Sequence, residues 1–364
     1  MITKEQLLDS IRVVNDPDLH RDIVSLGMVK EVGVDHEGNV SVHIELTTPA
    51  CPLKEQIKED VRKAVSVLPG VRAVAVQMSA NVRQAPAGLT AKAPIPGIKN
   101  VIAVASGKGG VGKSTVCTNL ALALARTGAR VGLMDADIYG PNIPLMLGIP
   151  ADEKPGVTED EKIIPLESQG LKVISMGVLV PAEAPMIWRG PMLHSAVTQF
   201  LQKVEWGELD YLLVDLPPGT GDVQLSLVQT VSVTGAVIVT TPQEVALMDV
   251  RKGAAMFQKT GVPILGVIEN MSSFVCPHCN QETPIFSRGG GKETAEKLGV
   301  SLLGEIPIDP RIREGGDEGR PIVIAHPESP AAKQFVQAAG VLAQQVSIVD
   351  VLGQKPAAAA SINK

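Results

Sequence analysis

The stretch VIAVASGKGGVGKSTVCTNLALALA, residues 101–125, decides the fold of this chain. Its centre, GKGGVGKST (107–115), matches the pattern G-x-x-x-x-G-K-[ST] and lies between an apolar run typical of a buried strand and a segment that continues as a helix. Glycines at this turn let backbone N–H groups wrap phosphate oxygens without a clashing side chain, and the helix N-terminus adds a fixed positive end. The stretch therefore predicts a phosphate-binding loop.

Each part of this loop has an expected role toward ATP. The Lys113 ammonium is expected to reach the outer phosphates, and the Ser114 hydroxyl to ligate Mg²⁺. The other contacts are expected from the loop as a whole, which comprises Gly107, Lys108, Gly109, Gly110, Val111, Gly112, Lys113, Ser114 and Thr115.

Acidic residues at the ends of two further apolar runs complete the phosphate site. YLLVDLPPGTGD (211–222) predicts a buried strand that ends in Asp215, which would hold the water shell of the magnesium ion. Gly219 follows where a backbone N–H could sense the terminal phosphate. Asp135 and Asp137 end another strand, at the carboxyl edge where sheets of this kind bind ligands.

Apolar runs alternate with helical patterns along the rest of the large region. Runs that are apolar on both faces and separated by helices imply a parallel sheet covered by helices on each side. The expected fold is therefore α/β, the doubly wound parallel sheet of P-loop NTPases, over residues 99–350. Besides 101–106, its strands are expected at 130–135, 211–216, 236–241, 263–270 and 301–307.

The residues before this region predict a small α+β domain at 1–82. Its order is helix, hairpin, helix and strand, with Thr3 as the cap of the first helix and Pro52 at the first position of the second. The expected elements are Lys4–Val14, Met28–Val34, Val40–Leu46, Pro52–Leu68 and Val71–Met78.

Two segments are expected outside the folded domains. QAPAGLTAKAPIPG, residues 84–97, is rich in Ala, Pro and Gly and has little periodicity, so we expect a linker over 83–98. The last residues, 351–364, have neither core residues nor a basic amphipathic face and are expected to be a disordered tail.

Composition and charge exclude several kinds of partner. Lys and Arg number 33 against 39 Asp and Glu, for a net charge of -6, and aromatic residues make up 2% of the chain. The sequence therefore has neither the basic surface nor the stacking platform expected of a nucleic-acid-binding protein. The polar opening MITKEQLLDS does not resemble a secretory signal, and the apolar runs are too short to span a bilayer. We expect a cytoplasmic protein without a membrane partner.

The chain contains four cysteines, of which Cys276 and Cys279 form a Cys-x-x-Cys pair. Two thiolates at this spacing suit a soft metal, but zinc sites and four-iron clusters call for about four protein ligands. The missing ligands could be Cys51 and Cys117 or the same pair of another chain. Cys117 is expected in the core and Cys51 lies in the other domain, so a symmetric dimer supplies them most simply.

Three interpretations of this pair remain open on the residues alone. They are an iron–sulfur cluster shared by two chains, a structural zinc site shared in the same way, and a redox dithiol. His278, between the cysteines, is expected to be a bystander. Cys51 precedes the predicted second helix, whose dipole would lower the pKa of its thiol, and it is either a second cluster-handling thiol or a residue without chemistry.

The run GKGGVGKST resembles the deviant phosphate loop of the nitrogenase iron protein and of septum-site and partition ATPases. This resemblance implies that Lys108 crosses a dimer interface to the partner's phosphates. It also implies a first switch at Asp135 and Asp137, where Asp137 positions the attacking water or serves the magnesium ion. The positions similar to the adenine-recognising ones are Asn270, Pro307 and Asp309.

The order of small domain, GKGGVGKST, DLPPGTGD and late Cys-x-x-Cys resembles the Mrp/ApbC family of iron–sulfur cluster carrier ATPases, and the small domain resembles the metal–sulfur cluster assembly domain. The resemblance implies a slow ATP hydrolase that works as a homodimer. It would share a cluster, of the 4Fe-4S type, through Cys276 and Cys279, and exchange it with scaffold proteins and recipient apoproteins.

Several alternatives to this reading are open. They are a partition or septum-positioning switch ATPase, a dimeric zinc-binding P-loop ATPase, an electron donor like the nitrogenase iron protein, and a metal-binding scaffold with a regulatory nucleotide site.

Overall fold

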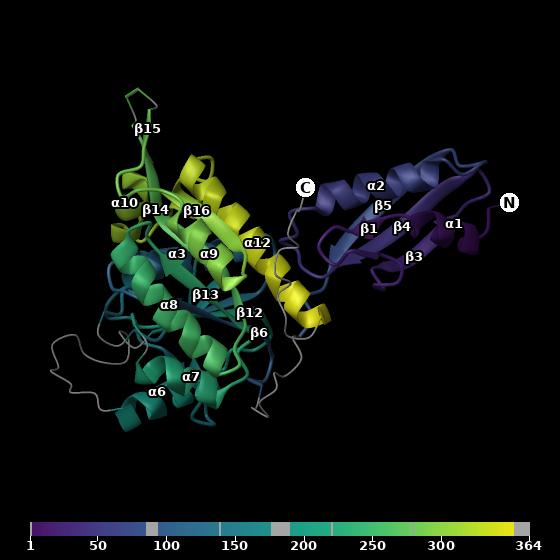
Figure 1. Cartoon of the computed structure of the whole chain (residues 1–364). Coiled ribbons are helices and arrows are strands. Elements are labelled where there is room, and N and C mark those ends of the chain that lie inside the picture. The colour runs from purple at the N-terminus through teal and green to yellow at the C-terminus, as the bar shows by residue number, and fades with distance from the viewer. Residues whose placement is uncertain are drawn as a thin grey trace. The chain divides into compact units, whose positions relative to one another are not determined.

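The chain folds as two units, residues Met1–Arg83 and Gln84–Lys364. The structure is a computed structural model that describes residues 2–84, 94–137, 140–175, 190–219, 221–276, 278–279 and 281–352. Most of the predicted linker and nearly all of the predicted tail lie outside these ranges. Figure 1 shows the elements of each unit.

The described part of the small unit consists of a three-stranded sheet, a short two-stranded ladder of β1 with β2, and two helices. The sheet has the order β3-β4-β5, in which β3 and β4 are antiparallel and β4 and β5 are parallel. Its core combines both helices and the sheet, through Leu7, Ile44 and Val61 among others. The elements are α1 Lys4–Ile11, β1 Asn15–Asp16, β2 Arg21–Asp22, β3 Val29–Val34, β4 Asn39–Leu46, α2 Lys54–Ser66 and β5 Ala73–Ala80.

The ends of the two small-unit helices confirm one prediction and contradict another. At the start of α1 the Thr3 hydroxyl accepts the Gln6 N–H at 3.2 Å while the Gln6 side chain accepts the Thr3 N–H at 2.9 Å, so the predicted cap is present. The second helix begins at Lys54 and not at Pro52. Residues 52 and 53 form a turn in which the Lys54 N–H reaches the Cys51 carbonyl, so the helix starts later than predicted.

The large unit is built on a mostly parallel sheet of nine strands. The order is β10-β11-β7-β12-β6-β13-β14-β15, and β16 also pairs with β14. Among the strands that the structure describes in this sheet, only the edge strands β10 and β15 run antiparallel to their neighbours. The strands are β6 Ile98–Ser106, β7 Val131–Asp135, β10 Leu166–Ser168, β11 Leu171–Ser175, β12 Leu209–Asp215, β13 Gly235–Thr240, β14 Ile264–Val275, β15 Glu282–Thr283 and β16 Leu302–Ile308, and a separate ladder joins β8 Gly156–Val157 to β9 Ile163–Ile164.

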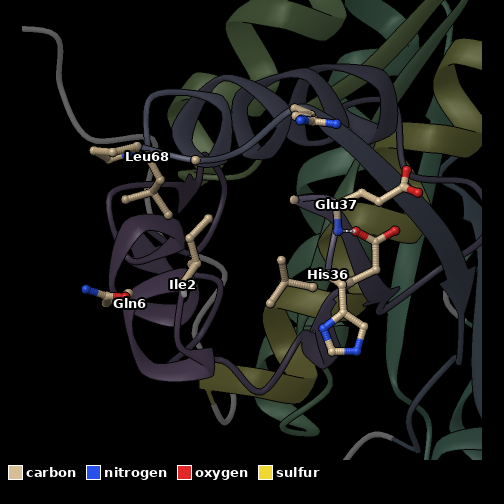
Figure 2. Close-up of a pocket in the computed structure, with 11 residues that line it drawn as sticks. Ile2, Gln6, His36, Glu37 and Leu68 are labelled. Atoms are coloured by element: carbon tan, nitrogen blue, oxygen red, sulfur yellow. Dashed lines mark hydrogen bonds between the residues drawn. The ribbon is translucent and has the colours of Figure 1, made fainter.

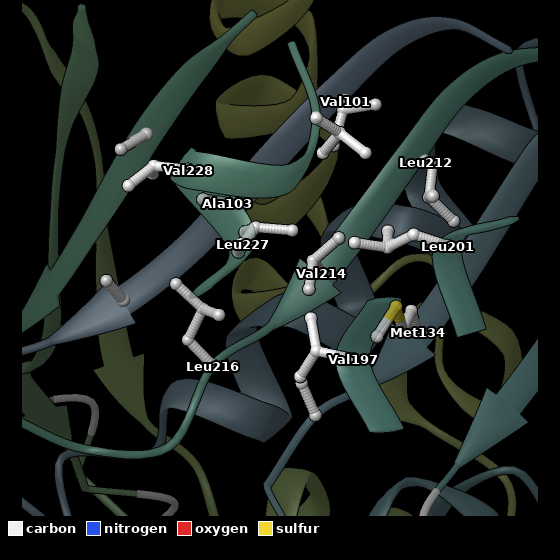
Figure 3. Packing of buried hydrophobic residues seen from close by; sticks show 14 of the residues in the cluster. Val101, Ala103, Met134, Val197, Leu201, Leu212, Val214, Leu216, Leu227 and Val228 are labelled. Atoms are coloured by element: carbon white, nitrogen blue, oxygen red, sulfur yellow. The ribbon is translucent and has the colours of Figure 1, made fainter. Parts of the chain in front are cut away.

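Helices cover both faces of this sheet, which confirms the doubly wound fold. One face packs against α6, α7 and α8 through a continuous apolar core (Figure 3). In that core Val197 and Leu201 of α6 and Leu227 of α7 meet Ala103 and Val214 of the sheet. On the other face α3 packs against α12 and against the central strands. The helices are α3 Lys113–Ala125, α4 Ile143–Met146, α6 Gly190–Lys203, α7 Asp222–Thr230, α8 Glu244–Lys259, α9 Gly290–Leu298, α10 Pro310–Asp317, α11 Ile322–Ala325 and α12 Pro330–Leu352.

Two strands differ from the prediction in ways that matter for the site. Strand β14 does not stop at residue 270 but continues to Val275, since Phe274 and Val275 pair with β15 and Phe274 also pairs with β16. It therefore leads directly into Cys276. Strand β11 was not predicted, and it places Ser175 opposite Asp135 on β7. Within the described residues no helix combines the length and the apolar character that a bilayer span requires.

Candidate nucleotide site and cysteine hairpin

The phosphate-binding loop joins β6 to α3, as the motif predicts. Gly110 and Gly112 adopt φ angles of 81° and 80°, in the left-handed region that favours glycine. A Cβ atom on Gly112 would also lie 2.3 Å from the Asn270 side-chain nitrogen. Asn270 Nδ2 donates to the Val111 carbonyl at 2.9 Å, so β14 holds the loop from its side. Both the backbone shape and the contact with Asn270 require glycine at residue 112.

Polar side chains from α3, β12 and the segment after β7 meet at this loop. Lys113 Nζ lies 2.8 Å from Asp215 Oδ1, and the Ser114 hydroxyl donates to Asp215 Oδ2 at 2.6 Å. Asp137 lies 4.0 Å from the same ammonium. Burial raises the pKa of Asp215, against the opposing effect of Lys113 and Ser114. The structure thus brings together the lysine, hydroxyl and carboxylates that the sequence predicted for the phosphate and magnesium site.

Asp135 is a fully buried carboxyl group beside Asp215. Ser175 donates its hydroxyl to Asp135 Oδ2 at 2.9 Å, and the Asp137 N–H donates to Oδ1 at 3.1 Å. Burial, and next the neighbouring Asp215 charge, raise the pKa of Asp135 to about 7. Sequence reasoning did not identify Ser175. The only available signal was a hydroxyl residue that closes the apolar run of residues 171–175.

Hydrogen bonds fix the backbone of the segment after β12, from Pro217 to Gly219. The Gly219 N–H, predicted to sense a phosphate, donates to the Ser106 carbonyl at 2.9 Å. Gln224 of α7 is buried and donates to the carbonyls of Pro217 and Gly219 at 2.6 and 3.0 Å. Gln224 is a further site residue that the sequence did not reveal. Lys108 lies in the loop with an exposed side chain.

A cavity of about 610 Å³ opens beside the loop. Gly112 and Thr115 line it at the phosphate end, together with Asn270, Pro307 and Asp309, the residues predicted to recognise adenine. Asp309 also caps α10 and pairs with the Arg311 guanidinium at 2.6 Å. The remaining wall is mostly apolar and includes Met146, Met271, Ile285, Phe286, Ile308 and Ile312. The flat, largely apolar base of a nucleotide fits such a cavity next to a phosphate loop. We call this cavity the base cavity.

Cys276 and Cys279 lie in the hairpin formed by β14 and β15, which we call the cysteine hairpin (residues 272–286). Figure 1 shows β15 and the end of β14 projecting from the sheet. The Cys276 N–H donates to the Gln281 carbonyl at 3.0 Å and closes the turn. The N–H groups of His278 and Cys279, and the Cys279 thiol, point to the Cys276 sulfur and hold the pKa of that thiol below its usual value. The hairpin thus presents adjacent, accessible sulfur atoms.

Among the described residues, potential metal ligands from elsewhere in the chain do not form a group with this pair. Over the described ranges, no group of three or more His, Cys, Asp or Glu side chains is arranged to hold a metal ion. Cys117 is fully buried in α3. Cys51 is half-buried, and burial raises the pKa of its thiol, so the predicted lowering by a helix dipole was wrong. The physical reason is that burial disfavours the charged thiolate, while α2 begins only at Lys54 and leaves Cys51 outside its first turn.

The small unit has a hollow of its own, of about 710 Å³ (Figure 2). Ile2 and Leu68 lie on one side, and His36 and Glu37 on the other. The Asp35 carboxylate at the edge of the hollow accepts the N–H groups of Glu37 and Asn39. This carboxylate is therefore already hydrogen-bonded within its own turn. The described walls of this hollow therefore offer no arrangement comparable to the phosphate site.

Comparisons with known proteins agree with this geometry. A family model described as NUBPL iron-transfer P-loop NTPase matches residues 97–343, and one described as iron–sulfur cluster assembly protein matches residues 4–78. An iron–sulfur cluster carrier protein of Deinococcus radiodurans is 54% identical over 345 residues, which is 94% of this chain and 96% of that protein. The iron–sulfur cluster transfer protein NUBPL of Dictyostelium discoideum is 51% identical over 71% of this chain and 80% of its own length.

Solved structures show the same fold for the large unit. A nucleotide-binding protein from Archaeoglobus fulgidus, in complex with ADP, superposes with a TM-score of 0.58 and 40% identity over 66% of this chain and 93% of that chain. The cell division ATPase MinD of Pyrococcus furiosus superposes with a TM-score of 0.50 and 29% identity over 67% of this chain and 98% of its own.

Proposed function

Since this chain belongs to the family of NUBPL iron-transfer P-loop NTPases, we propose that it carries an iron–sulfur cluster on the cysteine hairpin and passes it to recipient apoproteins in a process that uses ATP. The observation that carries the proposal is that one strand, β14, joins both functions. Its Asn270 bonds the phosphate loop and lines the base cavity, and its last residue precedes Cys276.

The residues beneath the loop fit a magnesium nucleotide. Mg²⁺ prefers hard oxygen ligands, and the Ser114 hydroxyl and Asp215 carboxylate provide them directly below the phosphate-binding backbone. The bound ion would neutralise charge on the phosphates. Lys113, already beside Asp215, contacts the outer phosphates, and Asp137 orients the attacking water. Asn270, Pro307 and Asp309 contact the adenine, and the Gly219 N–H serves the terminal phosphate once it leaves the Ser106 carbonyl.

Lys108 is the residue by which this loop resembles the deviant phosphate loop. Its side chain is exposed at the loop and does not line the base cavity. We therefore assign it to the phosphates of a partner chain across a homodimer interface. An ATPase whose site is completed by a second chain turns over slowly as a single chain, because its stabilising charge is supplied only on association.

The cluster itself is the cargo of the protein. Cys276 and Cys279 supply two thiolates, and a four-iron cluster calls for four ligands. The described part of the chain gathers no third ligand near them. Two chains related by a two-fold axis would supply four thiolates from one hairpin each, which supports a 4Fe-4S cluster shared between subunits. Scaffold proteins that donate clusters and apoproteins that receive them are the expected partners.

A transfer assay tests this function. Full-length protein is reconstituted anaerobically with iron and sulfide, and then mixed with Mg-ATP and an apoenzyme whose activity requires a four-iron cluster. We expect the wild type to restore that activity and Cys276→Ala to restore none. Cys51→Ala, which removes a thiol of the other unit, should behave as the wild type does. Activity restored equally by Cys276→Ala would refute the assignment of the cluster to this hairpin.

A further inference from the structure

Two residues of the cysteine hairpin also line the base cavity. Ile285 and Phe286, which line the cavity, belong to the return limb of the hairpin that carries Cys276 and Cys279. Met271, directly before the outgoing limb, lines the same cavity. The return limb and the residue that leads into the outgoing limb therefore both pass the place where a base would bind.

The return limb is anchored to the large unit just beyond the hairpin. Beyond the hairpin, Glu269 accepts the N–H groups of Gly289 and Gly291 at 3.2 and 2.5 Å. Arg288 pairs with Glu282 and Glu305 at 3.3 and 3.8 Å, on partly exposed side chains. Toward the tip, β14 pairs with β15 at Phe274 with Thr283 and at Val275 with Glu282, and the Cys276 N–H donates to the Gln281 carbonyl. Because this ladder is short, contacts made by Ile285 and Phe286 can add to what positions the return limb.

Ile285 and Phe286 are large apolar residues in an unusual setting. Ile285 is 52% exposed, and Phe286 is partly exposed. Pro284, with its fixed φ angle, joins them stiffly to the last paired residue, Thr283. A flat base against these side chains would bury apolar surface and restrict the limb within three residues of the ladder.

We propose that Ile285 and Phe286 are positioning residues that sense the nucleotide base and thereby fix the cysteine hairpin. This inference rests on the proposed function and names how its two sites communicate. It requires the base, because the phosphates contact the loop of residues 107–115 and not the return limb. By linkage, a ligand that favours the fixed hairpin and a base in the cavity strengthen each other's binding.

Hydrogen exchange of the cluster-free, full-length protein tests the proposal. Exchange of peptides from residues 272–286 is measured with Mg-ADP, with Mg-pyrophosphate, which lacks a base, and without ligand. We expect ADP to slow exchange in this hairpin by about fivefold or more, at the low end of typical couplings between sites, and pyrophosphate to leave it unchanged. Equal protection by both ligands would overturn the proposal, and this comparison needs no variant.

Variants locate the effect. Phe286→Ala and Ile285→Ala, each at saturating ADP, should lose most of the protection at 272–286 while peptides from 107–115 stay protected. Phe286→Leu should regain part of it. Val157→Ala, at a 66% exposed apolar residue that does not line the cavity, should keep it in full. Full protection in both alanine variants would also overturn the proposal. Because no cluster is present, a failure of the carrier function leaves this result unaffected, and the reverse holds too.

Discussion

Gly112 shows how a single residue serves both the loop and its neighbour. Gly112→Ala would force a side chain into a φ of 80° and place its Cβ atom 2.3 Å from the Asn270 amide. The left-handed conformation alone costs roughly 1–2 kcal/mol for a residue with a side chain. We expect Gly112→Ala to weaken ADP binding in a calorimetric titration by at least about tenfold more than Gly110→Ala does, since about 1.4 kcal/mol corresponds to a factor of ten.

Gly110→Ala is the matched control for this prediction. Its φ of 81° is almost the same, but a Cβ atom there would meet nothing within 4 Å. It therefore carries the backbone cost without displacing Asn270. Equal losses in the two variants would show that the contact between Asn270 and the loop contributes nothing to the site.

Asp135 should make the stability of the large unit depend on pH. Its pKa rises from 3.8 to about 7 on folding, so the native state keeps a proton that the unfolded chain has already released. Stability therefore falls as pH rises from about 4 to about 7 and is constant above that. Removing the ionisable group in Asp135→Asn should stabilise the variant relative to the wild type by about 2 kcal/mol more at pH 8 than at pH 5.5.

Denaturant unfolding at the two pH values measures this difference without nucleotide. Asp152→Asn, at an exposed position, should reproduce the wild-type dependence on pH. A difference between Asp135→Asn and the wild type that is the same at both pH values would contradict the proposed burial of a protonated carboxyl group.

Residues within one motif were predictable, whereas contacts between distant segments were not. Lys113 and Ser114 follow from their own pattern, and the structure brings both to Asp215. Ser175 lies 40 positions from Asp135 and is revealed only by the pairing of β11 with β7. The pKa of Cys51 was mispredicted because its thiol is half-buried, and the burial that raises its pKa depends on packing that the local sequence does not show.

At the scale of elements, strand β14 and helix α9 flank the cysteine hairpin where it joins the rest of the large unit. Glu269→Ala removes the carboxylate that accepts the N–H groups of Gly289 and Gly291 at the start of α9. An unsatisfied buried donor costs about 1–3 kcal/mol. We expect the amides of residues 289–298 to exchange faster by at least about tenfold, the factor that about 1.4 kcal/mol represents.

Glu269→Gln serves as the graded control, because its single carbonyl oxygen can accept only part of what the carboxylate accepts. Its exchange rates should lie between those of the wild type and Glu269→Ala. Unchanged exchange in Glu269→Ala would mean that α9 is held by packing alone.

The strands of the sheet were predictable to different extents for a physical reason. Continuous apolar runs such as 211–216 and 236–241 mark strands buried on both faces, and β12 and β13 confirm them. The last four residues of β14 read S-S-F-V and lack that pattern, since this end of the strand pairs at the rim of the sheet. The sequence therefore did not predict that the hairpin projects from the sheet, or that Ile285 and Phe286 line the base cavity.

At the scale of the whole molecule, the small unit has its own apolar core. We expect a fragment of residues 1–83 to fold by itself, with dispersed amide signals in NMR and a cooperative thermal transition. Thr3→Ala should lower its stability by about 1 kcal/mol, because the capping hydroxyl of α1 is lost. A fragment that is unfolded at neutral pH would show that the small unit depends on the rest of the chain.

The division into two units illustrates what composition alone can reveal. The Ala-, Pro- and Gly-rich stretch of residues 84–97 predicted a linker over 83–98, and the structure divides the chain between Arg83 and Gln84. The end of the linker was predicted too late, because Ile95 lies in the core of the large unit and β6 begins at Ile98. Which surfaces of two chains would meet is not encoded in any local pattern, because an interface is built from residues far apart in sequence. The shared cluster rests instead on the number of sulfur ligands that each chain presents.

Native mass spectrometry after anaerobic reconstitution with iron and sulfide counts chains and irons together. We predict a species of two chains with one cluster of about four irons. The Cys276→Ala variant should remain iron-free single chains. A single chain that holds a complete cluster, or iron retained after both Cys276 and Cys279 are replaced, would contradict the shared-cluster assignment.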